Sequence, residues 1–593
     1  MRTRNGGNKM RRKHLLSLFM LSMGVALLVA AMAAGGAMSA AKGGPGGIER
    51  VGLFGGSVSY LDPQIAYDTG SWTALNATSM NLVAYNDSNG LHSPLQLQGA
   101  VGFPSFRNSG KQITWKIKSG IKFSDGTDLT AASYRRSFER ILSPCMFGGG
   151  LGVADFFDKL IVGGVAYNHA PCNPSGHIAG VQASGQLLVI KLTHAAPYFT
   201  AAMAMMWFTA VPFDTPMDNN SQDDGASEFY ASAGPYFVQS ADPLGTVTIT
   251  MNRNPFYSGP RLANPTQIKF VQYGSQTTCY NDTAAGSPTV DVDLCGMTSA
   301  LAGQATTDYG ASTVTGVPAA AAGGGTQFHV ENTGCVDYLA YNTQRAPTDN
   351  VKVRQAISWA LDKATASNSL LKILGNFAGS HTGNILTPAI PGYKAFDIYG
   401  LTPNFPNAAA AAAGSLNGKN LEVWHSQSGT RTNQALAYEA TLNSLSSTYA
   451  MGLTVHDNTI ASVTYFTQLG DKALATGPSG YNIARAGWCA DYYDPFNYTN
   501  VLFDGKSITA LNNVNFSYLN VAKANSAMEK AAKLAGGARK SAYAAIDKSL
   551  VKDYAAALPY DLIGARILVA NTVSNYTYNG FQTSPALNAL SVN

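Results

Sequence analysis

The sequence lacks the short motifs that identify many common enzymes. Its 593 residues contain no Gly-x-Ser-x-Gly elbow, no His-Glu-x-x-His zinc pattern and no Gly-x-x-x-x-Gly-Lys phosphate loop. The nine histidines are scattered, so no pair of imidazoles supports nickel chelation. We therefore predict no catalytic residues, no metal and no cofactor, and a hydrolase is the least favoured class of function.

Cysteine is also scarce, with six residues in the chain and none in a Cys-x-x-Cys pattern. The first is Cys145, so no cysteine near the N-terminal segment is placed to carry a lipid tether. An even number of cysteines in an exported protein favours disulfides over free thiols. Six thiols allow fifteen sets of pairs, and the pattern alone does not choose among them.

The N-terminal segment has the pattern of an export signal. Six basic side chains precede an apolar run over 15–34, and small residues follow at 37–41. We expect residues 1–41 to be cleaved near Ala41, or to be retained as a membrane anchor, because the apolar run is about long enough to span a bilayer. The rest of the chain is then extracytoplasmic, whether in a periplasm, at the cell surface or secreted.

Acidic and basic residues nearly balance outside that segment. The formal net charge is +5, but residues 1–41 hold six basic and no acidic side chains, which leaves −1 for the remainder. The apparent basicity therefore gives no support for a nucleic-acid partner. The length exceeds what one hydrophobic core can organise, so two or three domains are expected.

Three segments combine strand patterns with groups suited to binding. Residues 484–495 bring an arginine, a tryptophan, a cysteine and two aspartates into one short, mostly extended run. Residues 335–343 are rich in tyrosine, and a helical pattern begins after Asn350. Residues 113–126 alternate apolar and polar side chains before two glycine turns, which predicts a hairpin, and Thr130 can cap the helix that follows.

Two further patterns are local. Residues 51–60 predict an early strand. The six alanines of 408–413 have high helix propensity and stop at Gly414, which predicts a short helix before a strand at 421–424.

Taken together and in this order, these segments resemble the signature segments of the family 5 extracellular solute-binding proteins. These are the peptide- and nickel-binding subunits of ABC importers, and the resemblance, over about 53–560, is strongest to the oligopeptide-binding members. It implies an α/β fold of the type II periplasmic-binding-protein kind, with two lobes joined by a hinge and an additional inserted subdomain, closing around a ligand. The implied boundaries are 46–85, 187–334 and 565–593 for lobe I, 86–186 for the inserted subdomain and 335–564 for lobe II.

The resemblance also implies one disulfide. Oligopeptide-binding members join the cysteine before the tyrosine-rich strand to the cysteine of the Gly-Trp-Cys-Ala-Asp segment. In this sequence the two positions are Cys335 and Cys489. Pairing the remaining cysteines by proximity along the chain then predicts Cys145 with Cys172 and Cys279 with Cys295.

Asp491 is the leading candidate for ligand contact. In the family that the chain resembles, this aspartate pairs with the free α-amino group of a peptide, which implies the same role here. A buried carboxylate facing a buried ammonium is favourable when both are present and well aligned. Position alone would favour a solvated carboxylate at a strand end instead, and the surrounding motif decides between the two interpretations.

The residues next to this aspartate are expected to act through their backbones and one ring. Gly487 and Cys489 would offer main-chain hydrogen bonds to an extended peptide laid beside the strand. The early segment that holds Ser57 and Tyr60 would pair with the other edge of the peptide. Trp488 would line a side-chain pocket, with ordinary core packing as its alternative.

Two arginines are candidates for the acidic parts of a ligand. Arg485 matches a family arginine associated with the carboxyl end of the peptide, and a guanidinium suits a carboxylate. A structural ion pair explains Arg485 equally well. Arg136 stands in a helix where relatives often carry a tyrosine that faces the pocket, so an Arg136 facing the ligand would favour acidic peptides or another anion.

The predicted function is therefore that of an extracytoplasmic binding protein that captures oligopeptides and delivers them to the permease of an ABC importer. The expected partners are a peptide and the permease subunits, and we expect a monomer. The alternatives are another ligand of the family, such as a dipeptide, a sugar, haem or a nickel complex, and a secreted peptide chaperone or signal-peptide receptor.

Overall fold

The computed structural model describes residues 46–55, 58, 60–87, 94–146, 157–217, 229–242, 247–310, 327–364, 369–375, 379–462 and 464–592. The predicted export segment and Ser57 lie outside the described residues. Within the described part, no helix has both the length and the apolar character needed to cross a membrane.

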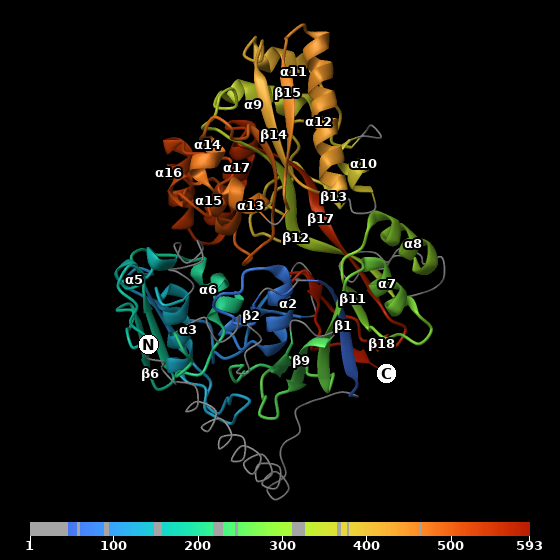
Figure 1. Ribbon diagram of the computed structural model, residues 1–593. Helices are drawn as coiled ribbons and strands as arrows, with labels where there is room; N and C mark the ends of the chain where they lie inside the picture. Colours follow the sequence, from blue (N-terminus) through green and yellow to red (C-terminus); the bar gives the residue numbers. More distant parts are fainter. Residues whose placement is uncertain are drawn as a thin grey trace, which may run out of the picture. The chain divides into compact units, whose positions relative to one another are not determined.

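A mixed sheet of eleven strands forms the frame of the described part (Figure 1). Its order is β15-β14-β16-β12-β17-β11-β1-β10-β9-β8, and β13 pairs with β17 beside this path. The strands are β1 (Ile48–Phe54), β8 (Tyr236–Ala241), β9 (Val247–Arg253), β10 (Gln267–Tyr273), β11 (Val292–Leu294), β12 (Phe328–Tyr341), β13 (Ser380–His381), β14 (Asn420–Ser426), β15 (Thr454–Ile460), β16 (Ile483–Trp488) and β17 (Ala557–Val569).

Strands β12 and β17 connect the two groups of strands in this sheet. Within the described residues, the first part of β12 pairs only with the end of β17, with Phe328 opposite Leu568. After a break in register between Asn332 and Val336, β12 pairs with the first part of β17 on one side and with β16 on the other. Two long antiparallel strands therefore carry the chain between the β8–β11 group and the β14–β16 group.

A separate four-stranded sheet has the order β4-β5-β7-β6. Its strands are β4 (Ser105–Arg107), β5 (Gln112–Lys116), β6 (Val181–Ser184) and β7 (Leu187–Lys191). As the alternation predicts, Ile113 and Trp115 are buried and Lys116 is exposed. Small two-stranded sheets join β2 (Val83–Tyr85) to β3 (Leu95–Leu97), β18 (Val573–Ser574) to β21 (Ser591–Val592), and β19 (Tyr578–Asn579) to β20 (Ser584–Pro585).

Helices pack against both sheets. Figure 1 shows α12 beside β14 and β15, and α15, α16 and α17 gathered together, as their contacts also indicate. The helices are α2 (Thr69–Thr78), α3 (Ala131–Leu142), α5 (Gly164–Asn168), α6 (Phe199–Ala202), α7 (Gln276–Ala284), α8 (Ser299–Tyr309), α9 (Val351–Ala360), α10 (Leu370–Leu374), α11 (Phe405–Ala412), α12 (Gly429–Thr448), α13 (Tyr465–Leu469), α14 (Lys472–Thr476), α15 (Phe496–Phe503), α16 (Ala522–Ala532) and α17 (Gly536–Lys552), with 3-10 turns η2 (Met206–Phe208) and η4 (Gly505–Ser507).

The predicted helix starts at Thr130 and Asn350 agree with the structure, whereas the C-cap predicted at Gly414 lies one residue earlier. Thr130 is the N-cap of α3, and its backbone N–H donates to the Ser133 hydroxyl at 3.2 Å. Asn350 caps α9 by accepting from the backbone N–H of Lys352 at 3.0 Å. The alanine run forms most of α11, which ends where Ala413 adopts a left-handed conformation with φ 44°.

Two local predictions need correction. The early strand is Ile48–Phe54 and does not reach Tyr60, because a turn at Gly55 follows β1. The hairpin after β5 is confined to an antiparallel bridge between Lys122 and Asp128, while β5 itself pairs with β4 and β7.

All three predicted disulfides are confirmed. Their cysteines are fully paired, with none left free in the chain. The bonds join Cys145 to Cys172, Cys279 to Cys295 and Cys335 to Cys489. The third bond ties the register break of β12 to the end of β16, so it holds together the two segments that carry the family-like motifs.

Candidate functional site

A cavity of about 170 Å³ lies at the C-terminal end of β16. Three stretches that are far apart in the sequence line it, and they fall within 67–72, 487–491 and 581–583. The first stretch leads into α2, whose N-cap Asp68 accepts from the backbone N–H of Ser71 at 2.7 Å. The cavity therefore lies where the start of α2 and the C-terminal region meet the Gly-Trp-Cys-Ala-Asp motif.

Asp491 lies in the wall of this cavity and is 9% exposed. The Tyr67 hydroxyl donates to its two carboxylate oxygens at 3.1 and 3.2 Å, and Asn497 Nδ2 donates at 2.8 Å. Burial raises the pKa of Asp491 to about 6, against the lowering effect of these two hydrogen bonds. Among the described residues, no lysine or arginine forms an ion pair with Asp491.

Asn497 also fixes the position of Asp491. Its Oδ1 accepts from the backbone N–H of Asp491 at 2.9 Å and from Trp488 Nε1 at 3.2 Å. One amide thus orients both the carboxylate and the indole that line the cavity. Trp488 is only partly buried, packs against the hydrophobic core and also lines the cavity.

Aromatic side chains hold Tyr67 in place. Its ring centroid lies 5.9 Å from that of Trp72 and 5.0 Å from that of Trp207. Both indoles donate to the carbonyl of Ala66, at 2.8 and 2.7 Å. Tyr67, Trp72 and Asn497 were not predicted from the sequence as site residues. Tyr67 just before α2 and Trp72 in its first turn are visible in the sequence, but nothing in the sequence pattern places them next to Asp491.

Arg485 forms an ion pair with Asp337 across the β12–β16 pairing. Arg431 on α12 approaches the same carboxylate at 3.3 Å. Burial acts to lower the pKa of Arg485, but Asp337, Tyr560 and Tyr465 together outweigh it. The pKa is therefore raised, and the guanidinium stays charged. The structural ion-pair interpretation of Arg485 therefore holds, although two guanidinium groups facing one carboxylate leave an excess of positive charge.

Gly487 makes room for this ion pair. It lies opposite Asp337 in the strand pairing, and a Cβ atom here would lie 2.7 Å from Asp337 Oδ1 and 3.3 Å from Arg485 Nη2. A side chain at this position would push into the buried pair. Gly487 also lines the cavity, so the cation excess and the cavity are adjacent.

In the part of the chain that the structure describes, the backbone beyond the start of β16 has one edge without a partner strand. In the described residues β14 pairs only with Ile483 and Ala484, whereas β12 pairs with the whole of β16. At the next residue of β16, the Tyr465 hydroxyl donates to the carbonyl of Arg485 at 2.9 Å. Gly487 and Cys489 both line the cavity beyond that point.

Two predicted ligand contacts are not brought to this cavity. Arg136 Nε and Nη1 donate to the carbonyls of Thr215 and Pro174 at 2.7 and 3.1 Å, and Arg136 is absent from the cavity lining. These loops therefore hold its guanidinium. Tyr60 is likewise outside the lining, and its backbone N–H donates to the Ser71 hydroxyl at 3.1 Å.

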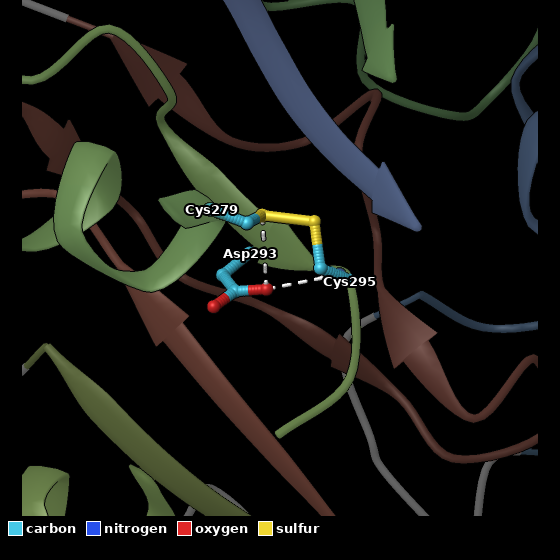
Figure 2. A group of neighbouring side chains, drawn as sticks. All are labelled: Cys279, Asp293 and Cys295. Carbon is cyan, nitrogen blue, oxygen red and sulfur yellow. Dashed lines mark hydrogen bonds between the residues drawn. A yellow bond between two sulfur atoms is a disulfide. The ribbon is translucent and has the colours of Figure 1, made fainter. Parts of the chain in front are cut away.

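One group of side chains in the described part has spacing that suits a metal: Cys279, Asp293 and Cys295. Figure 2 shows that the two sulfur atoms are bonded to each other, while Asp293 Oδ1 accepts from the backbone N–H of Cys295 at 2.9 Å. Metal ligation requires thiolates, which a disulfide does not supply. Burial raises the pKa of Asp293 to about 7. We therefore interpret Cys279, Asp293 and Cys295 as a buried disulfide with a structural role and a neighbouring carboxyl group.

Comparison with known proteins gives a family match over much of the chain. The model of the bacterial extracellular solute-binding proteins, family 5 Middle, matches residues 105–510. The periplasmic oligopeptide-binding protein OppA of Escherichia coli (strain K12) is 22% identical over 497 residues, 79% of each chain. OppA of Bacillus subtilis (strain 168) is 25% identical over 256 residues, which are 43% of this chain and 42% of that protein.

Solved structures share the fold. The structure of the clavulanic acid biosynthesis oligopeptide binding protein 2 has a TM-score of 0.78 at 21% identity and covers 94% of this chain and 97% of its own. The periplasmic binding protein DppA from Helicobacter pylori, in complex with the peptide STSA, has a TM-score of 0.68 at 18% identity, over 92% and 98%. The predicted fold class is confirmed. Because the family match spans more than half of its length, the chain belongs to family 5 of the bacterial extracellular solute-binding proteins.

Proposed function

We propose that this protein captures short peptides outside the cytoplasmic membrane and delivers them to the permease of an ABC importer. The observation that carries the proposal is Asp491, a buried carboxylate that faces a cavity and forms no ion pair within the described part of the chain. Relatives whose names specify oligopeptide or D,D-dipeptide binding support the class of ligand.

Asp491 is the proposed anchor for the α-amino group of the peptide. Ionising it in the empty cavity is unfavourable, as its raised pKa indicates, and a ligand ammonium would supply the missing counter-charge. The Tyr67 hydroxyl and Asn497 amide already direct the carboxylate, so little rearrangement is needed on binding. Trp72 and Trp488 would then cover the first side chain of the peptide.

The peptide backbone would continue along the open edge of β16. Addition of a strand to this edge gives affinity through main-chain hydrogen bonds, which do not depend on side-chain identity. The positive charge that remains after Asp337 is paired with Arg431 and Arg485 would favour a carboxylate at some distance from the ammonium. A zwitterionic peptide meets both requirements.

We also propose that the protein acts as a receptor without catalytic activity, and as a monomer. Peptide incubated with it should be recovered intact, whereas a hydrolase would shorten the peptide with time. Native mass spectrometry of the protein loaded with a mixture of short peptides tests the ligand class directly. We expect bound masses that form a series of peptides. A single constant non-peptide mass, or no bound peptide at all, would argue against peptide capture.

A further inference from the structure

A second cavity, of about 360 Å³, lies where residues 159–198 meet residues 496–533. Two aromatic rings form part of its wall: Tyr198 and Phe496 stack with their centroids 3.9 Å apart and their planes inclined by 11°. Leu160 and Ala532 add buried apolar surface. The wall of the cavity therefore includes aromatic and aliphatic side chains that a ring or branched chain can contact.

Basic side chains gather around this apolar surface. The cavity is lined by Lys159, His194, Lys506 and Lys533. Burial lowers the pKa of His194, and the charges of Lys533, Lys111 and Lys506 lower it further. A neutral imidazole beside several ammonium groups is the expected result of a locally positive field.

The acidic side chains of the lining do not cancel this charge. Glu529 pairs with the Lys506 ammonium. Asp504 accepts from the backbone N–H of Lys506 at 3.0 Å, and burial raises its pKa. Within the described ranges, neither the Lys159 nor the Lys533 ammonium has a carboxylate within 4.0 Å. Two lysines are thus available to an anion entering from solvent.

We propose that this cavity is a second binding site, which takes a small organic acid with an aromatic or branched apolar body. The ring or chain would pack on Tyr198 and Phe496 while the carboxylate meets Lys159 and Lys533. The site does not share lining residues with the Asp491 cavity and has the opposite charge preference. Its ligand would contact two segments separated by about 300 residues, and so would stabilise their contact.

Three probes test the class of ligand: 3-phenylpropionate, the amine of similar shape 3-phenylpropylamine, and propionate, which keeps the carboxylate but lacks the ring. Saturation-transfer NMR and calorimetry on the full chain should detect 3-phenylpropionate, with much weaker binding of the other two. Equal binding of the amine would exclude a site selected by charge. Equal binding of propionate would exclude the apolar part of the site, and no binding of 3-phenylpropionate would overturn the proposal.

Variants locate the binding. The double variant Lys159→Ala with Lys533→Ala should lose about tenfold or more in affinity for 3-phenylpropionate. A control with the same charge change, Lys394→Ala with Lys548→Ala, removes exposed lysines from a different groove and should bind as the wild type does. Equal losses in both variants would indicate non-specific charge attraction.

Asp491→Asn separates this site from the proposed peptide site. The variant should keep wild-type affinity for 3-phenylpropionate, because Asp491 does not line the second cavity. If the acid instead loses its binding in Asp491→Asn, it occupies the first cavity and the second-site proposal is wrong. If the protein fails to capture peptides but still binds 3-phenylpropionate, the proposed peptide function is wrong and the second-site proposal is retained.

Discussion

Asp491→Asn provides the sharpest test of the amine anchor. The wild-type carboxylate is 9% exposed and forms no ion pair within the described residues, so the ligand ammonium would be its counter-charge. Removing one partner of a buried ion pair costs on the order of 3 to 5 kcal/mol. Affinity for a peptide with a free N-terminus should therefore fall by about two to three and a half orders of magnitude.

The fold should tolerate this substitution. Asn497 Oδ1 already accepts from the Asp491 backbone and from Trp488, so the Asn497 amide keeps its orientation and continues to donate toward residue 491. The new amide nitrogen would face Tyr67, whose hydroxyl can accept as well as donate. Loss of a buried charge with a raised pKa should leave the empty protein at least as stable at pH 7.

A cycle with acetylated peptide isolates the interaction. Acetylation removes the ammonium, so wild-type protein should lose affinity for the blocked peptide while Asp491→Asn loses little more. Calorimetry on the four combinations gives the coupling energy. Asp128→Asn, which changes a side chain that is 69% exposed, is the charge-matched control and should bind as wild type does. Simple additivity, or equal wild-type affinity for blocked and free peptides, would refute the anchor.

Three further predictions follow from burial and close contact. Because burial raises the pKa of Asp491 to about 6, peptide affinity should rise with pH and reach a plateau above pH 6. Affinity at pH 5 should be about tenfold weaker than at pH 7.5. Calorimetry should show that the peptide affinity of Asp491→Asn does not change over this pH range. Gly487→Ala would place a Cβ 2.7 Å from Asp337 Oδ1, so chemical denaturation should show a loss of about 1–3 kcal/mol, whereas Gly274→Ala, with no atom within 4 Å, should be nearly neutral. Both carboxylate oxygens of Glu49 are buried without a partner in the described structure, and burial, then Asp291, raises its pKa well above the usual value. As pH rises from 5 to 8, the free energy of unfolding of the wild type should therefore fall relative to that of Glu49→Met. The Glu49→Met variant should be more stable by about 1–3 kcal/mol. Equal pH profiles of the two proteins would contradict this account of Glu49.

Features with a local cause could be predicted from the sequence. Thr130 and Asn350 cap helices through bonds to residues two or three positions away, and the alanine run of α11 ends beside Gly414. The pairing of Cys335 with Cys489 is not local, and it could be predicted only because the two motifs that contain them resemble family segments. The lobe boundaries remain a prediction.

Features that depend on packing between distant segments could not be predicted. Tyr67 reaches Asp491 because α2 begins beside the end of β16, a placement that no periodicity in the chain contains. The partner of Arg485 depends on the register of β12 against β16, which puts Asp337 opposite Gly487 and within reach of the guanidinium. The sequence motif therefore singled out Asp491, which lines the cavity, but left Arg485 open between two roles.

The surroundings of Asp337 and Asp491 explain why Asp337 suits a structural role and Asp491 suits ligand binding. Asp337 has two guanidinium groups beside it, so its charge is neutralised by the chain itself and remains so whether or not a ligand is present. Within the described residues, the side-chain partners of the Asp491 carboxylate are a hydroxyl and an amide, which orient it without neutralising it. A buried charge that lacks its partner lowers the stability of the empty protein, and that free energy is recovered when an ammonium enters. The same difference predicts that a ligand with a free amine should raise the Tm of the wild type, but not the Tm of Asp491→Asn.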